Sequence, residues 1–126
     1  MERISTAGAP SAIGPYSQGI IHGDLVFLAG QIGLDPATGR LVEGGVVAEV
    51  ERALANVGAA LEAAGSGLDR VLRVVLYLAD LADFEAVNQA MARAFREPFP
   101  ARSTVEVARL PRDARVEIEV TAARSG

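Results

Sequence analysis

One arginine stands at the start of an apolar stretch near the end of the chain. Residues 98–120 read PFPARSTVEVARLPRDARVEIEV, a pattern that predicts two β-strands joined by a tight connection, with Arg102 just after Pro98 and Pro100. The planar guanidinium of an arginine can grip a carboxylate through two parallel hydrogen bonds, which a lysine does less well. Arg102 is therefore a candidate receptor for a small carboxylate.

A carboxylate and a hydroxyl are expected close to this arginine. In the last strand, from Arg115 to about Ala123, the apolar side chains fall on one face and Glu119 falls on the other. If the last two strands form a hairpin with a short loop, Thr104 lies opposite Glu119 and Arg102 lies diagonal to it on the same face. The alternatives are a surface ion pair without a role, or a register shifted by one residue.

Asn88, Tyr16 and His22 are the other polar residues for which a role in a site is compared with a purely structural one. Asn88 falls between Phe84 and Met91 on the apolar edge of a predicted helix, where an amide costs free energy unless it is hydrogen-bonded. The alternative is a boundary residue turned to solvent. Tyr16 follows Gly-Pro in a rigid turn, where it either belongs to a site or anchors the N-terminal arm. His22, the single histidine, is expected to be a solvated turn residue, so a Ser-His-Asp triad is not expected.

The composition argues against several classes of protein. The 126 residues predict one domain, 1–126. The chain has no cysteine and one histidine, so neither a thiolate nucleophile nor a Cys/His metal site is expected. The net charge of −4 makes nucleic acid a poor partner. Neither a signal peptide nor an apolar run of membrane-spanning length is apparent, so we expect a cytoplasmic protein that does not bind membranes.

The remaining elements predict how these residues are held. In chain order they are an arm over 1–16, two strands within 18–31 that turn at Gly23-Asp24, a loop, a helix over 46–64, a strand over 71–79 and a helix over 83–96 capped by Asp83. On the first helix, Asn56 lies off the apolar stripe. The order ββ-α-β-α-ββ predicts an α+β fold with both helices on one face of a single sheet. We expect subunits to meet at the opposite face, near Val75 and Tyr77, because 50% of this small chain is apolar.

Four segments, IGPYSQG, LAGQIGLDPATG, FEAVN and PFPARSTVEVARLPRDARVEIE, resemble the signature segments of the RidA/YjgF family of imine deaminases. The resemblance covers roughly residues 5–123. It implies a chorismate-mutase-like fold and a homotrimer with three clefts between subunits. The implied activity is hydrolysis of 2-imino acids, released by pyridoxal-phosphate enzymes, to 2-oxo acids and ammonia. The resemblance implies that no cofactor and no metal are needed.

The resemblance also implies roles for individual residues. Arg102 would bind the substrate carboxylate, Glu119 would position the attacking water, and Tyr16 would belong to the cleft. The other implied substrate-binding positions are Ala29, Gly30, Gln31, Asn88 and Thr104. Many members have Ser-Gly-Gln where this chain has Ala29-Gly30-Gln31, so a hydroxyl that could touch the ligand is missing here. Backbone groups of Gly30 and Gln31 could still contribute.

Three other functions stay open at this point. A non-catalytic regulatory trimer that senses small carboxylates would use Arg102 but not Glu119. An endoribonuclease or translation inhibitor, an activity also attributed to the family, is opposed by the acidic charge and by the lack of a basic patch with aromatic residues. A related deaminase acting on another substrate, such as an enamine or an aminoacrylate derivative, is left open by Ala29.

Overall fold

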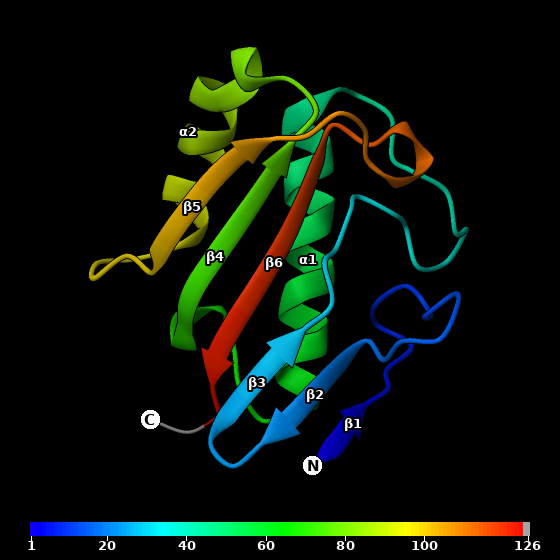
Figure 1. Ribbon diagram of the computed structural model, residues 1–126, viewed down its shortest axis with the longest axis vertical. Coiled ribbons are helices and arrows are strands. Elements are labelled where there is room, and N and C mark those ends of the chain that lie inside the picture. Colours follow the sequence, from blue (N-terminus) through cyan, green and yellow to red (C-terminus); the bar gives the residue numbers. More distant parts are fainter. Residues whose placement is uncertain (125–126) are drawn as a thin grey trace.

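The computed structural model describes residues 1–124 and contains a six-stranded mixed sheet with two helices on one face (Figure 1). The elements are β1 (Glu2–Ile4), β2 (Gly19–His22), β3 (Leu25–Leu28), α1 (Val46–Ala63), β4 (Val71–Leu78), α2 (Phe84–Ala94), β5 (Ala101–Glu106) and β6 (Val116–Ala123). The strand order is β1-β2-β3-β6-β4-β5. Strands β4 and β5 are parallel, and the other neighbours are antiparallel. The predicted α+β arrangement, with both helices on one face, is confirmed.

The last two strands do not form the predicted hairpin. Strand β4 lies between them, and its residue Val75 pairs with Glu119 of β6 on one side and with Ser103 of β5 on the other. Thr104 therefore lies opposite Leu76 of β4 and not opposite Glu119. The predicted pairing is wrong because β4, which is apolar on both faces, occupies the centre of this part of the sheet.

Arg102 and Glu119 consequently lie on opposite faces of the sheet. Residues paired across neighbouring strands send their side chains to the same side. Arg102 pairs with Val74, which is fully buried beneath the helices, whereas Glu119 pairs with Val75 on the open side. The expectation that both residues share one face of a single chain is therefore wrong.

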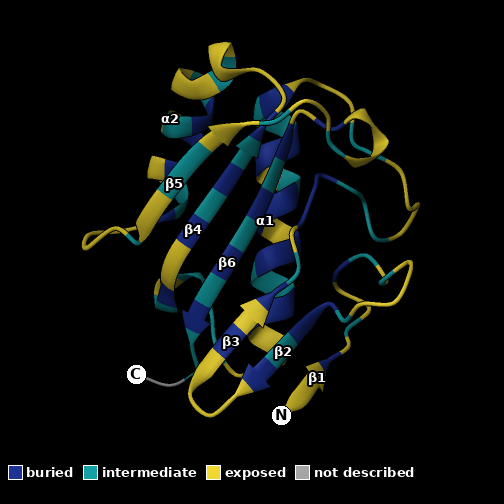
Figure 2. Cartoon of the chain, in the orientation of Figure 1, coloured by how far each residue is buried: buried dark blue, intermediate teal, exposed yellow. Residues whose placement is uncertain are grey.

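Helix α1 covers the middle of the sheet and ends where the sequence predicts. Figure 2 shows buried residues along α1 and alternating along β4 and β6, as expected for strands with one covered face. Gly65 adopts a φ of 78°, and the N–H of Ser66 donates to the carbonyl of Leu61 at 2.9 Å. This left-handed glycine closes the helix in the way its position predicts.

Asn56 does not face solvent, although it lies off the apolar stripe of α1. It is fully buried, and its amide donates to the carbonyl oxygens of Ile32 and Leu34 at 3.3 and 2.9 Å. Its oxygen accepts a hydrogen bond from the Arg52 guanidinium at 2.9 Å. These bonds attach the loop that follows β3 to α1. Because the loop supplies Gly30 and Gln31, Asn56 helps to position candidate site residues.

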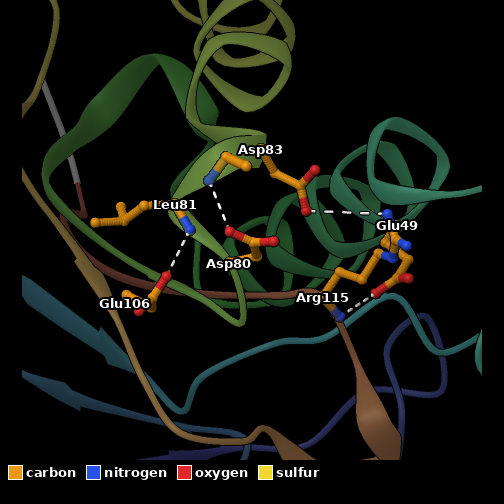
Figure 3. Close-up of polar contacts among 7 residues, drawn as sticks. Glu49, Asp80, Leu81, Asp83, Glu106 and Arg115 are labelled. Carbon is orange, nitrogen blue, oxygen red and sulfur yellow. Dashed lines mark hydrogen bonds and ion pairs between the residues drawn. The ribbon is translucent and has the colours of Figure 1, made fainter.

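Polar contacts at one end of the sheet fix the turns around α2 (Figure 3). The N–H of Leu81 donates to Glu106 of β5 at 2.8 Å, and the N–H of Arg115 donates to the buried Glu49 of α1 at 2.8 Å. The Arg115 guanidinium also lies 3.9 Å from the Asp83 carboxylate. Both helices are thereby linked to the chain at the ends of β5 and β6.

The second helix begins where the sequence predicts and ends two residues early, at Ala94. The Asp83 side chain, predicted to cap this helix, makes no capping hydrogen bond. Asp80 provides a cap one turn earlier, because its carboxylate accepts a hydrogen bond from the N–H of Ala82 at 2.9 Å. This bond stabilises a short 3-10 turn, Leu81–Asp83, that leads into α2.

Strand β1 lies within the segment that the sequence predicts as an arm. It pairs with β2, and Ile4 lies opposite Gly19. A Cβ on Gly19 would lie 2.7 Å from the terminal methyl groups of Ile4 and Leu28, so a larger residue here would require both side chains to shift. Three residues are too few for a recognisable alternation, which is why the pattern does not reveal β1. Neither helix of residues 1–124 is long and apolar enough to cross a membrane.

Candidate active site

The site residues predicted from the sequence fall into two groups on different parts of the molecule. We define the arginine half-site as Asn88, Arg102 and the apolar residues that line a cavity with them. We define the carboxylate half-site as Tyr16, Gly30, Gln31, Tyr77, Glu117 and Glu119. The first group lies between α2 and β5, and the second lies on the open side of β4 and β6 and in the loops beside it.

The arginine half-site surrounds a cavity of about 320 Å³. Its lining residues are Val74, Asn88, Met91, Ala92, Phe95, Phe99, Pro100 and Arg102. The guanidinium carbon of Arg102 lies 5.6 Å from the ring centre of Phe84, within the range of a cation–π contact. Phe84, Asn88 and Met91 follow one another at helical spacing, so one face of α2 presents the ring and the amide toward β5.

Both polar groups of this half-site are available to a ligand. Within residues 1–124, Arg102 forms no salt bridge and its side chain is exposed. The half-buried Asn88 amide likewise has no hydrogen-bond partner in the described part of the chain. A guanidinium fork beside an amide can donate several hydrogen bonds to one carboxylate. Thr104 lies on the same side of β5, two residues further along, but outside the residues that line this cavity.

The carboxylate half-site borders a second cavity, of about 360 Å³. The N-terminal arm, the loop after β3, the turn before β6 and β6 itself supply its walls, including Tyr16, Gly30, Gln31, Arg112 and Glu117. Tyr16 is 54% exposed, and its hydroxyl accepts a hydrogen bond from the N–H of Ile13 at 3.3 Å. The position of Tyr16 is therefore compatible with both roles considered from the sequence.

Gln18 is the residue that fastens the arm beside Tyr16. Its buried side chain accepts a hydrogen bond from the N–H of Thr6 at 2.7 Å and donates to the carbonyl oxygens of Thr6 and Pro10 at 3.0 and 2.8 Å. Sequence reasoning did not single out Gln18, because a lone glutamine after a turn gives no signal of burial. With the arm held by Gln18, Tyr16 remains at the cavity wall.

The loop after β3 uses most of its backbone groups within the fold. Gln31 and Ile118 exchange two backbone hydrogen bonds of 2.8 and 2.9 Å, and the N–H of Ala29 donates to the carbonyl of Gln18 at 2.9 Å. The N–H of Gln31 is therefore already used within the fold, and a backbone contact of Gln31 with a ligand would use the second lone pair of its carbonyl oxygen. Gln31 stays a predicted site residue. A Cβ on Gly30 would lie 2.8 Å from the Glu117 carboxyl carbon, so a larger residue here would require the Glu117 side chain to move.

Two carboxylates occupy the open face of β6. The hydroxyl of Tyr77 donates to Glu119 at 2.7 Å, and this bond, together with burial and the nearby carboxylates, raises the pKa of Tyr77. Glu117 lies two residues earlier on the same face, and burial, reinforced by the charge of Glu119, raises the pKa of its carboxyl. Sequence reasoning passed over Glu117 and Tyr77 as site residues. The i, i+2 spacing of the two glutamates was the available signal for Glu117.

Comparisons with known proteins agree over nearly the whole chain. A family model described as endoribonuclease L-PSP matches residues 6–124. The 2-iminobutanoate/2-iminopropanoate deaminase of goat, Capra hircus, is 50% identical over 119 residues, which cover 94% of this chain and 87% of that protein.

Solved structures are also similar to this chain over nearly its whole length. RidA from a Psychrobacter species superposes with a TM-score of 0.94 at 41% identity, covering 98% of this chain and 99% of that one. TdcF of Escherichia coli with bound serine superposes with a TM-score of 0.92 at 38% identity, covering 99% and 100%. A match of this extent in both sequence and structure shows that the chain belongs to the RidA/YjgF family.

Proposed function

We propose that this protein hydrolyses 2-imino acids to 2-oxo acids and ammonia, as a 2-iminobutanoate/2-iminopropanoate deaminase. The observation that carries the proposal is the free guanidinium of Arg102 beside the free amide of Asn88, at the edge of an apolar cavity. The goat relative is named for this activity. A second relative holds serine, which has a carboxylate next to a nitrogen-bearing carbon, as a 2-imino acid does.

The active site in this proposal forms between subunits of a homotrimer with a chorismate-mutase-like fold, in which residues 1–126 act as one domain. The arginine half-site of one copy faces the carboxylate half-site of the next. Two observations support this assembly. Arg102 and Glu119 lie on opposite faces of the sheet in one chain, and the open face exposes Phe27 and Val105 by 45% and 43%. Apolar side chains on a sheet face favour a protein partner.

The chemistry needs only groups that the chain supplies. Arg102 and Asn88 hold the substrate carboxylate, with Thr104 beside them on β5, and the fixed geometry makes attack by water effectively intramolecular. Glu119 orients the water and accepts its proton, in a position fixed by the Tyr77 hydroxyl. General base catalysis by such a carboxylate typically contributes about 10²–10⁴-fold. Tyr16 and Gly30 enclose the substrate from the arm and loop.

The direct test generates the substrate in place. An amino-acid oxidase acting on alanine or 2-aminobutyrate releases the corresponding imine, and formation of the 2-oxo acid is followed with and without the purified protein. We expect the protein to accelerate 2-oxo acid formation from both imines. Binding of 2-oxobutanoate without any acceleration would replace this proposal by the regulatory alternative.

The description of the family model calls for a second measurement on RNA. A net charge of −4 gives little attraction for a phosphate backbone, so we expect no cleavage and no salt-dependent binding of RNA by the pure protein. Cleavage of RNA that disappears in the Arg102→Ala variant would contradict the assignment of this site to imines.

A further inference from the structure

A third cavity, of about 800 Å³, lies where β4 begins and α2 ends. Its walls come from the turn before β4, from the segment between α2 and β5, and from the end of β6. It is larger than the cavity of either half-site. Neither the resemblance nor the proposed mechanism gives this cavity a task. We call it the Arg70 cavity, after the residue that distinguishes it.

Arg70 carries a charge that the fold leaves without a partner. The residue is half-buried and ends the 3-10 turn Leu68–Arg70, which leads into β4. Its Nη1 atom is buried and has no hydrogen-bond partner, and within residues 1–124 the side chain forms neither a salt bridge nor any other hydrogen bond. A buried donor without a partner costs free energy, and native proteins keep few of them. An anion in the cavity would compensate this charge.

The acids beside Arg70 do not neutralise it. The Asp69 carboxylate is turned toward the backbone of Gly67, because its Oδ1 lies 2.8 Å from the place where a Cβ of Gly67 would stand. Glu97 is exposed and forms no ion pair in the described part of the chain, and the same holds for its neighbour Arg96. The lining thus contains two arginines and two acids. These acids repel a doubly charged phosphate more than a singly charged carboxylate.

The rest of the lining is mostly apolar, with Leu68, Val71, Leu72, Phe95, Pro98 and Pro100 in the wall. Leu72 is 49% exposed and lies at a β-bulge, where the pairing of β4 with β6 shifts between Val71 and Arg73. The extra residue of a bulge leaves the regular alternation of a strand. Apolar walls with a few polar groups that fix orientation are typical of sites for small organic molecules.

We propose that the Arg70 cavity is a second ligand site, which binds a small organic monocarboxylate with an apolar body. The Arg70 guanidinium receives the carboxylate, as arginine does in bidentate pairs, and the apolar wall encloses the body. The site is separate from the arginine half-site, because Arg102 does not line it. The two are adjacent, however, since Phe95 and Pro100 border both cavities. This inference does not rest on imine hydrolysis.

Calorimetric titration with 4-phenylbutanoate tests the proposal. The Arg102→Ala protein is used throughout, so that the adjacent half-site offers no guanidinium. We expect one molecule to bind per chain. Arg70→Met, which keeps an apolar stem and removes the charge, is expected to raise Kd by about 10–10²-fold, the value of a hydrogen bond to a charged group. An unchanged Kd, or no binding of 4-phenylbutanoate at millimolar concentration, would overturn the proposal.

The matched control is Arg93→Met, because Arg93 is exposed on α2 and lines neither the Arg70 cavity nor the cavities of the two half-sites. It is expected to leave Kd unchanged. An equal loss of affinity in Arg93→Met and Arg70→Met would mean that the ligand responds to the overall charge of the protein, and would contradict a site at Arg70.

Two further probes separate the charge of the ligand from its apolar body. The alcohol 4-phenylbutan-1-ol has the body without the charge, and inorganic phosphate has charge without the body. Both are expected to bind at least about 10-fold more weakly than 4-phenylbutanoate. Equal binding of the alcohol would remove Arg70 from recognition, and equal binding of phosphate would show that the apolar wall takes no part. Either result would contradict the proposed ligand class.

Thermal unfolding distinguishes a ligand site from an arginine that stabilises the fold. Because Nη1 of Arg70 has no partner, Arg70→Met removes an unpaired buried group and is expected to keep or raise Tm in the absence of ligand. Added 4-phenylbutanoate is expected to raise Tm of the Arg102→Ala protein, and not of the Arg70→Met variant made in it. A clearly lower Tm of Arg70→Met without ligand would contradict an unpartnered guanidinium. None of these measurements uses imine hydrolysis, so the proposed function and the Arg70 site can fail separately.

Discussion

The arginine half-site and the carboxylate half-site differ in how their charges are partnered. Arg102 lies over an aromatic ring in a mostly apolar cavity and has no carboxylate beside it in the described part of the chain. Glu117 and Glu119 lie together on the opposite face of the sheet, where Tyr77 holds one of them. If both residues lay on the same face of the sheet, Arg102 and Glu119 could form an ion pair and occupy the position of the ligand. The fold keeps the cation free by separating it from the acids.

The largest expected effect comes from removing the cation. Arg102→Ala is expected to lower kcat/KM for 2-iminopropanoate by about 10²–10³-fold, because loss of one partner of a desolvated charge pair costs about 2–5 kcal/mol. The fold is expected to survive, since Arg102 is exposed. The matched control is Arg109→Ala, because the Arg109 side chain is 79% exposed, forms a salt bridge with Asp113 and lines neither cavity. Equal rates in Arg102→Ala and Arg109→Ala would remove the arginine half-site from the mechanism.

Substitution of Glu119, the proposed general base, separates the effect of the carboxylate half-site on turnover from any effect on ligand binding. Glu119→Gln is expected to reduce kcat by about 10²-fold, at the low end of a general-base contribution, while the Kd for 2-oxobutanoate changes little. The carboxylate of this product analogue binds at the other half-site. The measurement combines steady-state kinetics with calorimetric titration, and a parallel loss of affinity and rate would argue that Glu119 binds the ligand instead of transferring a proton.

Substitution of Asn56 tests whether helix α1 holds the loop that carries Gly30 of the carboxylate half-site. Asn56→Ala leaves two loop carbonyl oxygens without their buried donor, which is expected to lower the free energy of unfolding by about 1–3 kcal/mol. Urea unfolding measures the change, with Gln89→Ala on the exposed side of α2 as the control. Full stability of Asn56→Ala would mean that the loop carrying Gly30 does not depend on α1.

The smallest effect is expected from Ala29, where many family members have serine. Ala29→Ser adds a neutral hydroxyl near Gly30, and a neutral hydrogen bond is worth about 0.5–1.5 kcal/mol, so kcat/KM is expected to change by less than about 10-fold. The ratio of kcat/KM for 2-iminopropanoate and 2-iminobutanoate is the sensitive readout. A change well above 10-fold would place Ala29 in direct contact with the reacting groups.

Local patterns in the sequence predicted the elements well, and the pairing of strands poorly. Helix α1 and the hairpin of β2 and β3 follow from spacing and from Gly23, which adopts a φ of 59° in the turn. The order β6-β4-β5 does not follow from proximity in sequence, because the last two strands both pair with β4. The alternation of polar and apolar residues in β5 and β6 does not show whether these two strands pair with each other or with β4, which precedes them in the chain.

The candidate site was predictable in its residue types and unpredictable in its geometry. Arg102 and Asn88 stand out because a cation and an amide interrupt apolar patterns, and the structure brings them to one cavity. The supporting residues Gln18 and Asn56 are polar side chains whose burial depends on distant backbone carbonyls. Such contacts leave no periodic signal. The separation of Arg102 from Glu119 depends on strand order, which local pattern does not encode.

Arg102 of one copy and Glu119 of the next are proposed to act on the same substrate molecule, and subunit exchange tests this directly. Arg102→Ala and Glu119→Gln proteins, each nearly inactive alone, are mixed in equal amounts, unfolded and refolded together. Random reassembly is expected to restore about a quarter of the wild-type rate, because each site in a cyclic trimer takes one side from each of two neighbouring copies. If both residues acted from the same chain, no mixed trimer would contain a complete site. A mixture that stays as inactive as its two components would therefore contradict a shared site.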